Sequence, residues 1–121
     1  MIYDENNIFA KILRGEIPCN KIYEDNFILS FYDINPQKKI HALVIPKGKY
    51  IDLDHFSMNA STEEIVGLLK GINKVAKKLE ISADTGKGYR ALANISDYGG
   101  QEVPHLHFHL FGGEKVGKMV E

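Results

Sequence analysis

The heptapeptide Pro104-His105-Leu106-His107-Phe108-His109-Leu110 decides the fold, because its histidines and its apolar residues alternate. Alternate residues of an extended strand point to the same face of a sheet. We therefore predict a strand that turns three imidazoles to one surface and Leu106, Phe108 and Leu110 to a hydrophobic core. Imidazole titrates near neutral pH, so such a row indicates a metal site, a proton-handling or nucleophilic site, or a pH sensor.

Length and composition restrict the class of protein. The 121 residues, 44% of them hydrophobic, fit one globular domain. The net charge is −1 with basic and acidic residues intermixed, which argues against a nucleic acid as the main partner. No apolar run approaches the ~20 residues that a membrane helix needs. Cys19 is the single cysteine, so neither an internal disulfide nor a cysteine-based zinc site is expected. We expect a cytoplasmic protein.

The rest of the sequence predicts two helices and four more strands. Asn7 caps a short apolar helix that ends at Gly15, and Ser61 and Glu64 form a capping box before a helix of about five turns. The patterns predict strands at 21–23, 27–33, 41–46 and 89–95, and an irregular connection or a short turn of helix at 51–56. Short turns between consecutive strands imply an antiparallel sheet. The predicted class is α+β, with five strands, one long helix and one short helix.

Two chemistries compete for the histidine row. Neighbours on one face of a strand are ~7 Å apart and zinc binds nitrogen at ~2.1 Å, so a further ligand would have to be His41 or a carboxylate such as Glu102. A neutral imidazole can instead attack phosphorus while its neighbours donate hydrogen bonds to the oxygens that gain charge. Gly99-Gly100 and Gly112-Gly113 would let backbone N–H groups approach a phosphate. We favour the nucleophilic site.

The motif resembles that of the histidine triad (HIT) family, His-φ-His-φ-His-φ-φ with φ hydrophobic, and the chain is similar to the Hint branch of nucleoside phosphoramidases and nucleotide-binding proteins. The other matching stretches, in chain order, are Ile8-Phe9-Ala10-Lys11-Ile12, Gly15-Glu16-Ile17-Pro18, Phe31-Tyr32-Asp33-Ile34-Asn35-Pro36, His41-Ala42-Leu43-Val44-Ile45-Pro46-Lys47 and Gly99-Gly100-Gln101-Glu102-Val103. The resemblance implies one HIT-like domain over residues 1–121, with a core at about 8–113 and a tail at 114–121. It also implies a five-stranded antiparallel sheet that continues across a homodimer.

The resemblance further implies a reaction: cleavage of the phosphorus–nitrogen bond of purine nucleoside phosphoramidates through a nucleotidyl-histidine intermediate. By similarity, His107 attacks the α-phosphorus, and His105 and His109 orient it and stabilise phosphate charge. His41 completes the catalytic set, and Asp33 accepts the ribose hydroxyls. The positions implied for the phosphate and the leaving group are Asn94, Gly100, Gln101 and Glu102. The apolar residues implied at the nucleotide are Phe9, Ile12, Ile17, Phe31, Ile34 and Leu43, several of which would serve equally as ordinary core. The expected partners are purine nucleoside monophosphate derivatives and a second copy of the chain.

The chain departs from the family in three places. Asn7-Ile8-Phe9-Ala10 stands where some relatives carry a Cys-x-x-Cys zinc pair, so neither zinc nor another cofactor is expected. Glu102 stands where some relatives carry serine, which leaves open how the leaving group is protonated. The tail lacks the tryptophan-containing ending of animal Hint proteins. Two other functions stay open: a dinucleoside polyphosphate hydrolase of the same superfamily, and a non-enzymatic nucleotide-binding interaction module.

Overall fold

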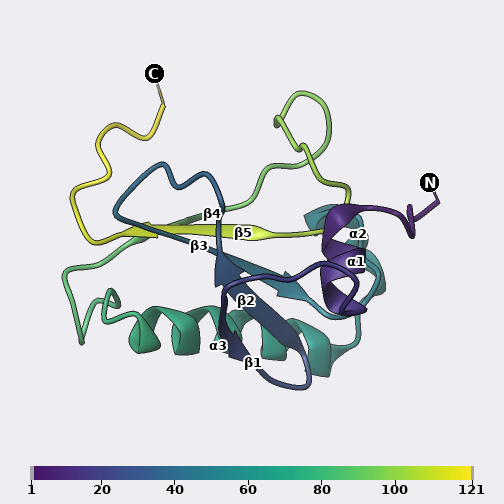
Figure 1. The fold of residues 1–121 in the computed structure, drawn as a ribbon, viewed down its shortest axis with the longest axis horizontal. Coiled ribbons are helices and arrows are strands. Elements are labelled where there is room, and N and C mark those ends of the chain that lie inside the picture. Colours follow the sequence, from purple (N-terminus) through teal and green to yellow (C-terminus); the bar gives the residue numbers. More distant parts are fainter. Residues whose placement is uncertain (1, 121) are drawn as a thin grey trace.

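The computed structural model describes residues 2–120, and within them the chain forms one five-stranded antiparallel sheet and three helices (Figure 1). The strands are β1 (Lys21–Glu24), β2 (Ile28–Tyr32), β3 (Ile40–Pro46), β4 (Arg90–Leu92) and β5 (Phe108–Gly112). The helices are α1 (Ile8–Leu13), α2 (Leu53–Asn59) and α3 (Thr62–Lys78). The strand order β1-β2-β3-β5-β4 places the last strand of the sequence between β3 and β4. The α+β class and the antiparallel sheet are confirmed, and the histidine segment enters the middle of that sheet.

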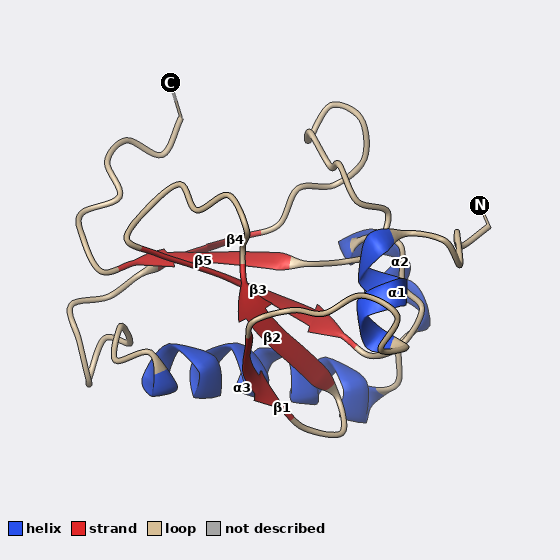
Figure 2. Ribbon diagram, viewed as in Figure 1, coloured by secondary structure: helices blue, strands red, loops and turns tan. Residues whose placement is uncertain are grey.

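Two hydrophobic clusters lie on opposite faces of the sheet. Alternate residues of β3 separate them, because Val44 packs with α3 on one face and Leu43 packs with α1 on the other. Leu106 and Leu110 are fully buried in the cluster under α3, and Phe108 packs against it, as the alternation predicts. Figure 2 shows α3 running along one side of the sheet, and α1 and α2 beside one end of the sheet. The histidines therefore belong to the face that α1 covers.

The helix caps agree with the prediction, and one further helix is present. The side chain of Asn7 accepts a hydrogen bond from the N–H of Ala10 over 2.9 Å, and Ser61 and Glu64 form both bonds of a capping box. Of the two alternatives expected at 51–56, the short helix is present: it is α2, and the side chain of Asp52 caps it. Of the three helices that the structure describes, none has the length and hydrophobicity of a membrane span.

The histidine strand is shorter than predicted. Only His109 of the three histidines lies in β5, which begins at Phe108. Phe108 pairs with Val44, so the next residue facing that side, Leu106, would have to pair with Pro46, which has no N–H to donate. The N–H of Leu106 instead donates to the carbonyl of Tyr50 over 2.8 Å.

β4 is also shorter than the strand predicted at 89–95. Its last pair joins Leu92 to His109, one residue from the start of β5. The chain after Leu92 therefore has little strand left to pair with, and it leaves the sheet as the loop that leads to β5. This loop carries residues 93–107 past the end of the sheet (Figure 1).

Candidate active site

Histidines from two neighbouring strands meet on the α1 face of the sheet. The register of β3 and β5 pairs Leu43 with His109 and His41 with Phe111, so His41 and His109 are diagonal neighbours. Nε2 of His41 lies 2.9 Å from Nδ1 of His109. The ring of His107 lies edge-on to that of His109, with 5.1 Å between the ring centroids. The fold thus joins His41, a residue far away in the sequence, to the histidine row.

These rings open onto a cleft of about 370 Å³, a volume typical of small-molecule sites. Its lining residues are Phe9, Asp33, Asn35, Gln37, His41, Leu43, Asn94, Gly100, Glu102, Val103, His107 and His109. Among the described residues that line it, two are carboxylates and none is lysine or arginine. Any positive charge or hydrogen-bond donor for an anion must therefore come from the histidines, the amides or the backbone.

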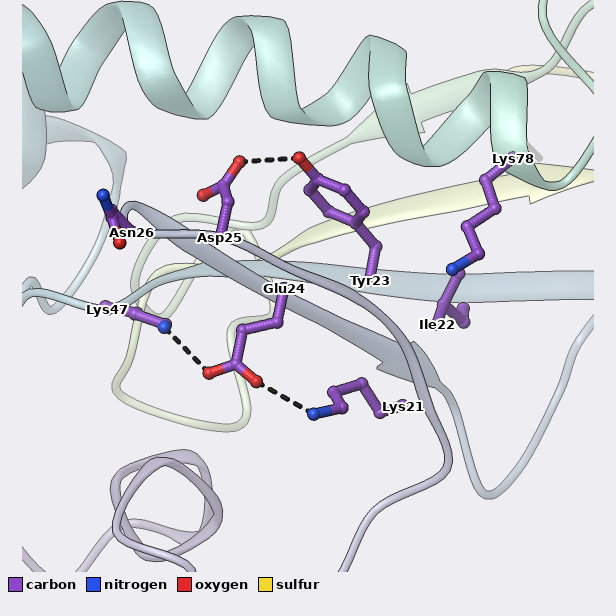
Figure 3. Close-up of a pocket in the computed structure, with 8 residues that line it drawn as sticks. All are labelled: Lys21, Ile22, Tyr23, Glu24, Asp25, Asn26, Lys47 and Lys78. Carbon is purple, nitrogen blue, oxygen red and sulfur yellow. Dashed lines mark hydrogen bonds and ion pairs between the residues drawn. The ribbon is translucent and has the colours of Figure 1, made fainter.

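A larger hollow of about 620 Å³ lies along β1 (Figure 3). Its charged side chains are largely paired with one another: Glu24 bridges Lys21 and Lys47 over 3.0 and 2.8 Å, and the Tyr23 hydroxyl donates to Asp25. None of the described residues that line it is a histidine. The chemistry therefore belongs to the smaller cleft.

The ring of His105 lies behind the cleft and does not line it. It is fully buried, with Nε2 2.9 Å from the carbonyl oxygen of Pro46 and Nδ1 2.6 Å from the hydroxyl of Tyr3. A carbonyl only accepts, so Nε2 carries the proton and Nδ1 accepts from Tyr3. Burial lowers the pKa of His105 to about 4, so the ring is neutral at pH 7. Both nitrogens of His105 are therefore engaged within the protein, a placement that suits the expected role of orienting His107 better than that of stabilising phosphate charge.

His107 offers an unprotonated nitrogen at the cleft. Its Nδ1 lies 2.8 Å from the backbone carbonyl of His105 and must donate there, which leaves Nε2 of the neutral ring without a proton. Burial lowers the pKa of His107, opposed by that hydrogen bond and by the charges of Asp33 and Glu102. No buried side-chain nitrogen or oxygen of the described chain lacks a partner. Nε2 makes no hydrogen bond with any residue in 2–120, so it must reach the cleft surface.

His41 and His109 form a chain of hydrogen bonds with the opposite polarity. The backbone N–H of Gln37 donates to Nδ1 of His41 over 3.1 Å, so the proton of the neutral His41 ring sits on Nε2. That N–H donates to Nδ1 of His109, which places the proton of His109 on its own Nε2. Burial, with help from His107 and His41, lowers the pKa of His109 to about 4. Burial also lowers the pKa of His41, and Asp33, 3.5 Å away, opposes the shift. His109 therefore presents an N–H beside the lone pair of His107.

Asp33, His41 and His109 are also the one group in residues 2–120 whose ligand atoms, all within 4.8 Å of one another, could surround a metal ion. A metal on Nε2 of His41 would push the proton of that ring to Nδ1. There it would face the N–H of Gln37, and two donors would point at each other. The hydrogen-bonding pattern thus favours a proton-holding chain over a metal centre.

Gln101 supports the cleft without lining it. Its side-chain amide donates to the carbonyls of Ile51 and Val103 over 2.7 and 3.0 Å. These bonds hold the loop whose Gly100 and Glu102 line the cleft. The nucleotide-binding role expected of Gln101 is therefore better described as fixing the loop.

The residues expected at the site divide into two sets. Those that line the cleft are His41, His107, His109, Asp33, Asn94, Gly100, Glu102, Phe9 and Leu43. Those that do not are His105, Gln101, Ile12, Ile17, Phe31 and Ile34. Phe31 is buried against Phe9, and Ile34 is 87% exposed. Gln37, Asn35 and Val103 also line the cleft, and the sequence reasoning did not assign any of them to the site.

Comparisons of the sequence and of the fold with known proteins lead to the same family. A family model described as the HIT domain matches residues 14–116. An uncharacterised HIT-like protein of Azospirillum brasilense is 50% identical over 118 residues, which are 98% of this chain and 94% of that protein. The purine nucleoside phosphoramidase of Escherichia coli (strain K12) is 38% identical over 117 residues, 96% of this chain and 94% of the relative. A HIT family hydrolase from Clostridium thermocellum has a solved structure with a TM-score of 0.84 at 37% identity, covering 98% of this chain and 99% of that one.

Proposed function

This chain belongs to the HIT family, and we propose that it hydrolyses the phosphorus–nitrogen bond of purine nucleoside phosphoramidates. Its fold is that of a HIT family hydrolase. The observation that carries the proposal is the unprotonated Nε2 of His107 at the cleft, next to the N–H of His109. The printed name of the E. coli relative supports the substrate class.

The proposed reaction has two steps. Nε2 of His107 attacks the α-phosphorus, the Nε2–P bond forms, and the P–N bond breaks with its electron pair going to the amine, which takes up a proton. The N–H of His109 donates to a phosphate oxygen as charge develops there. Water then attacks the phosphorus and loses its proton, and the electron pair of the Nε2–P bond returns to His107. The products are a nucleoside monophosphate and an amine.

The charge of the cleft favours this substrate over a dinucleoside polyphosphate. Asp33 and Glu102 line the cleft, whereas its described lining contains no permanent cation. A nucleoside phosphoramidate brings one negative charge to the site, and a polyphosphate brings several. Each further negative charge near the two carboxylates is repelled by them and makes binding weaker. Asp33, at the His41 end of the row, remains the residue that we expect to accept the ribose hydroxyls.

His107→Ala tests the nucleophile. We expect the variant to lose turnover of adenosine phosphoramidate while calorimetry still detects AMP binding. Intact-mass spectrometry of the wild-type protein, quenched during turnover, should detect a nucleotidyl adduct that the variant lacks. His55→Ala is the matched control, because His55 lies in α2 and does not line the cleft. Wild-type turnover by His107→Ala would refute the assignment.

Two comparisons define the substrate and the cofactor requirement. A phosphoramidate and a diadenosine polyphosphate, assayed side by side, separate the proposed activity from the other hydrolase activity of the superfamily, and we expect the phosphoramidate to be preferred. Exhaustive chelation should leave activity unchanged, because the proposed steps use only protein side chains. A chelator-sensitive enzyme would contradict this part of the proposal.

A homodimer and a cytoplasmic location remain part of the proposal. β4 is an edge strand of the sheet, and its central residue Ala91 is exposed. An edge strand leaves backbone N–H and C=O groups available for pairing with a second copy. Sedimentation equilibrium should give twice the monomer mass.

A further inference from the structure

An aromatic side chain from outside the HIT motifs contacts the first histidine of the row. The Tyr3 hydroxyl lies 2.6 Å from Nδ1 of His105, and the two rings meet edge-on with 5.6 Å between centroids. Tyr3 belongs to the segment before α1, which Figure 1 shows at the end of the molecule where the chain enters β5. Glu5 ties this segment to the body through Lys49 and Arg14.

The contact closes the hydrogen bonding of a fully buried ring. Pro46 holds Nε2 of His105 on one side, and Tyr3 holds Nδ1 on the other. His105 then offers its backbone carbonyl to Nδ1–H of His107, the bond that leaves Nε2 of His107 unprotonated. The ring of Phe9 packs edge-on against both histidines, with centroids 6.4 and 5.0 Å away. A shift of the His105 ring would therefore displace His107, both through the His105 carbonyl that accepts from it and through the Phe9 ring that packs against both.

We propose that Tyr3 is a positioning residue for the nucleophile: its hydroxyl clamps the His105 ring against Pro46 and so keeps the His105 carbonyl in line with Nδ1–H of His107. The inference rests on the proposed function, since it concerns the same nucleophile. Without the hydroxyl, Nδ1 of His105 becomes a buried acceptor with no donor, a state that the ring avoids by turning or by admitting water. Either change loosens the carbonyl that selects the tautomer of His107.

Tyr3→Phe removes only the hydroxyl. Since one hydrogen bond is lost, we expect kcat to fall about three- to tenfold and KM to stay within about twofold. Two-bond ¹H–¹⁵N spectra of histidine-labelled protein should show a single Nδ1–H tautomer for His107 in the wild type and a mixed population in the variant. Tyr3→Ala, which also removes the ring, should lower kcat further. Tyr23→Phe is the control, because Tyr23 lies in β1, its hydroxyl donates to Asp25, and neither residue lines the cleft.

Two results would overturn the inference. One is a Tyr3→Phe variant whose kcat matches that of Tyr23→Phe. The other is a lower kcat with an unchanged His107 tautomer, because the hydroxyl would then act on stability alone. The spectra need no substrate. A wild-type protein that proves inactive on phosphoramidates would refute the proposed function, while the tautomer measurement would still decide the role of Tyr3.

Discussion

Replacing His105 by glutamine tests whether the structure holds that ring neutral. Burial lowers the pKa of His105 from its ordinary 6.5 to about 4. Between these two values the unfolded chain binds a proton at this residue and the folded chain does not. The stability that the protein gains from keeping this ring neutral is therefore fully present above pH 6.5 and is lost as the pH falls toward 4.

The size of the loss follows from the two pKa values. Each unit of difference between the two pKa values corresponds to about 1.4 kcal/mol. The protonation of His105 alone should therefore lower the free energy of unfolding of the wild-type protein by about 3 kcal/mol between pH 6.5 and pH 4. Glutamine does not titrate. Over the same pH range the free energy of unfolding of His105→Gln should therefore fall by about 3 kcal/mol less than that of the wild type, whatever the stability of the variant at pH 7. Other groups that titrate contribute to both proteins and largely cancel in the difference.

Urea unfolding followed by far-UV circular dichroism measures the effect, since the chain has no tryptophan to report by fluorescence. At fixed protein concentration, the midpoint of the wild type should fall by about 1–2 M more than that of the variant between pH 6.5 and 4. Equal losses in the two proteins would mean that the ring titrates normally. The tautomers assigned to His105 and His107 would then have to be revised.

Three further predictions concern activity and the loop before β5. The acid limb of kcat/KM should lie below pH 6.5, because burial lowers the pKa of His107 and only the neutral ring attacks; a limb above 6.5 would contradict this. Glu102→Gln should move that limb to lower pH, because the Glu102 charge raises the pKa of His107; a pH–rate profile that does not move would show that the carboxylate acts elsewhere. Gln101→Ala should lower the free energy of unfolding by about 2 kcal/mol and reduce kcat/KM, because the loop loses its hydrogen bonds to Ile51 and Val103. Urea titration measures the first effect and steady-state kinetics the second. An unchanged kcat/KM would show that the position of the loop does not affect catalysis.

Alternation in the sequence was enough to predict the two faces of the histidine segment. Leu106 and Leu110 are fully buried because an extended chain turns every second side chain to the same side, whether or not it is paired in a sheet. The start of β5 could not be predicted in the same way. It depends on which residue of β3 lies opposite, and Pro46, 60 residues before Leu106, happens to be the one that cannot donate a hydrogen bond.

The site shows the same limit more sharply. The resemblance to the HIT family pointed to His41, and the register of β3 with β5 explains its position beside His109. No pattern in the sequence pointed to the N–H of Gln37, because a backbone group carries no side-chain signature. Tyr3 was missed for another reason: its contact with His105 spans 102 residues and depends on how the segment before α1 folds back.

Two backbone groups of opposite polarity give chemically identical rings opposite tasks. A neutral imidazole has one N–H, so the partner of Nδ1 decides what Nε2 offers. At His107 that partner is a carbonyl, so Nε2 is left with a lone pair. At His41 it is the N–H of Gln37, so the proton of His41 sits on Nε2 and donates to Nδ1 of His109, and His109 in turn keeps its own proton on Nε2. A lysine or arginine in place of His109 could also donate to phosphate, but Asp33, which has a carboxylate oxygen within 4.8 Å of a ring nitrogen of His109, would hold it in an ion pair. Neutral rings escape that competition, and for this reason a cleft that carries two carboxylates is suited to phosphate chemistry by histidine.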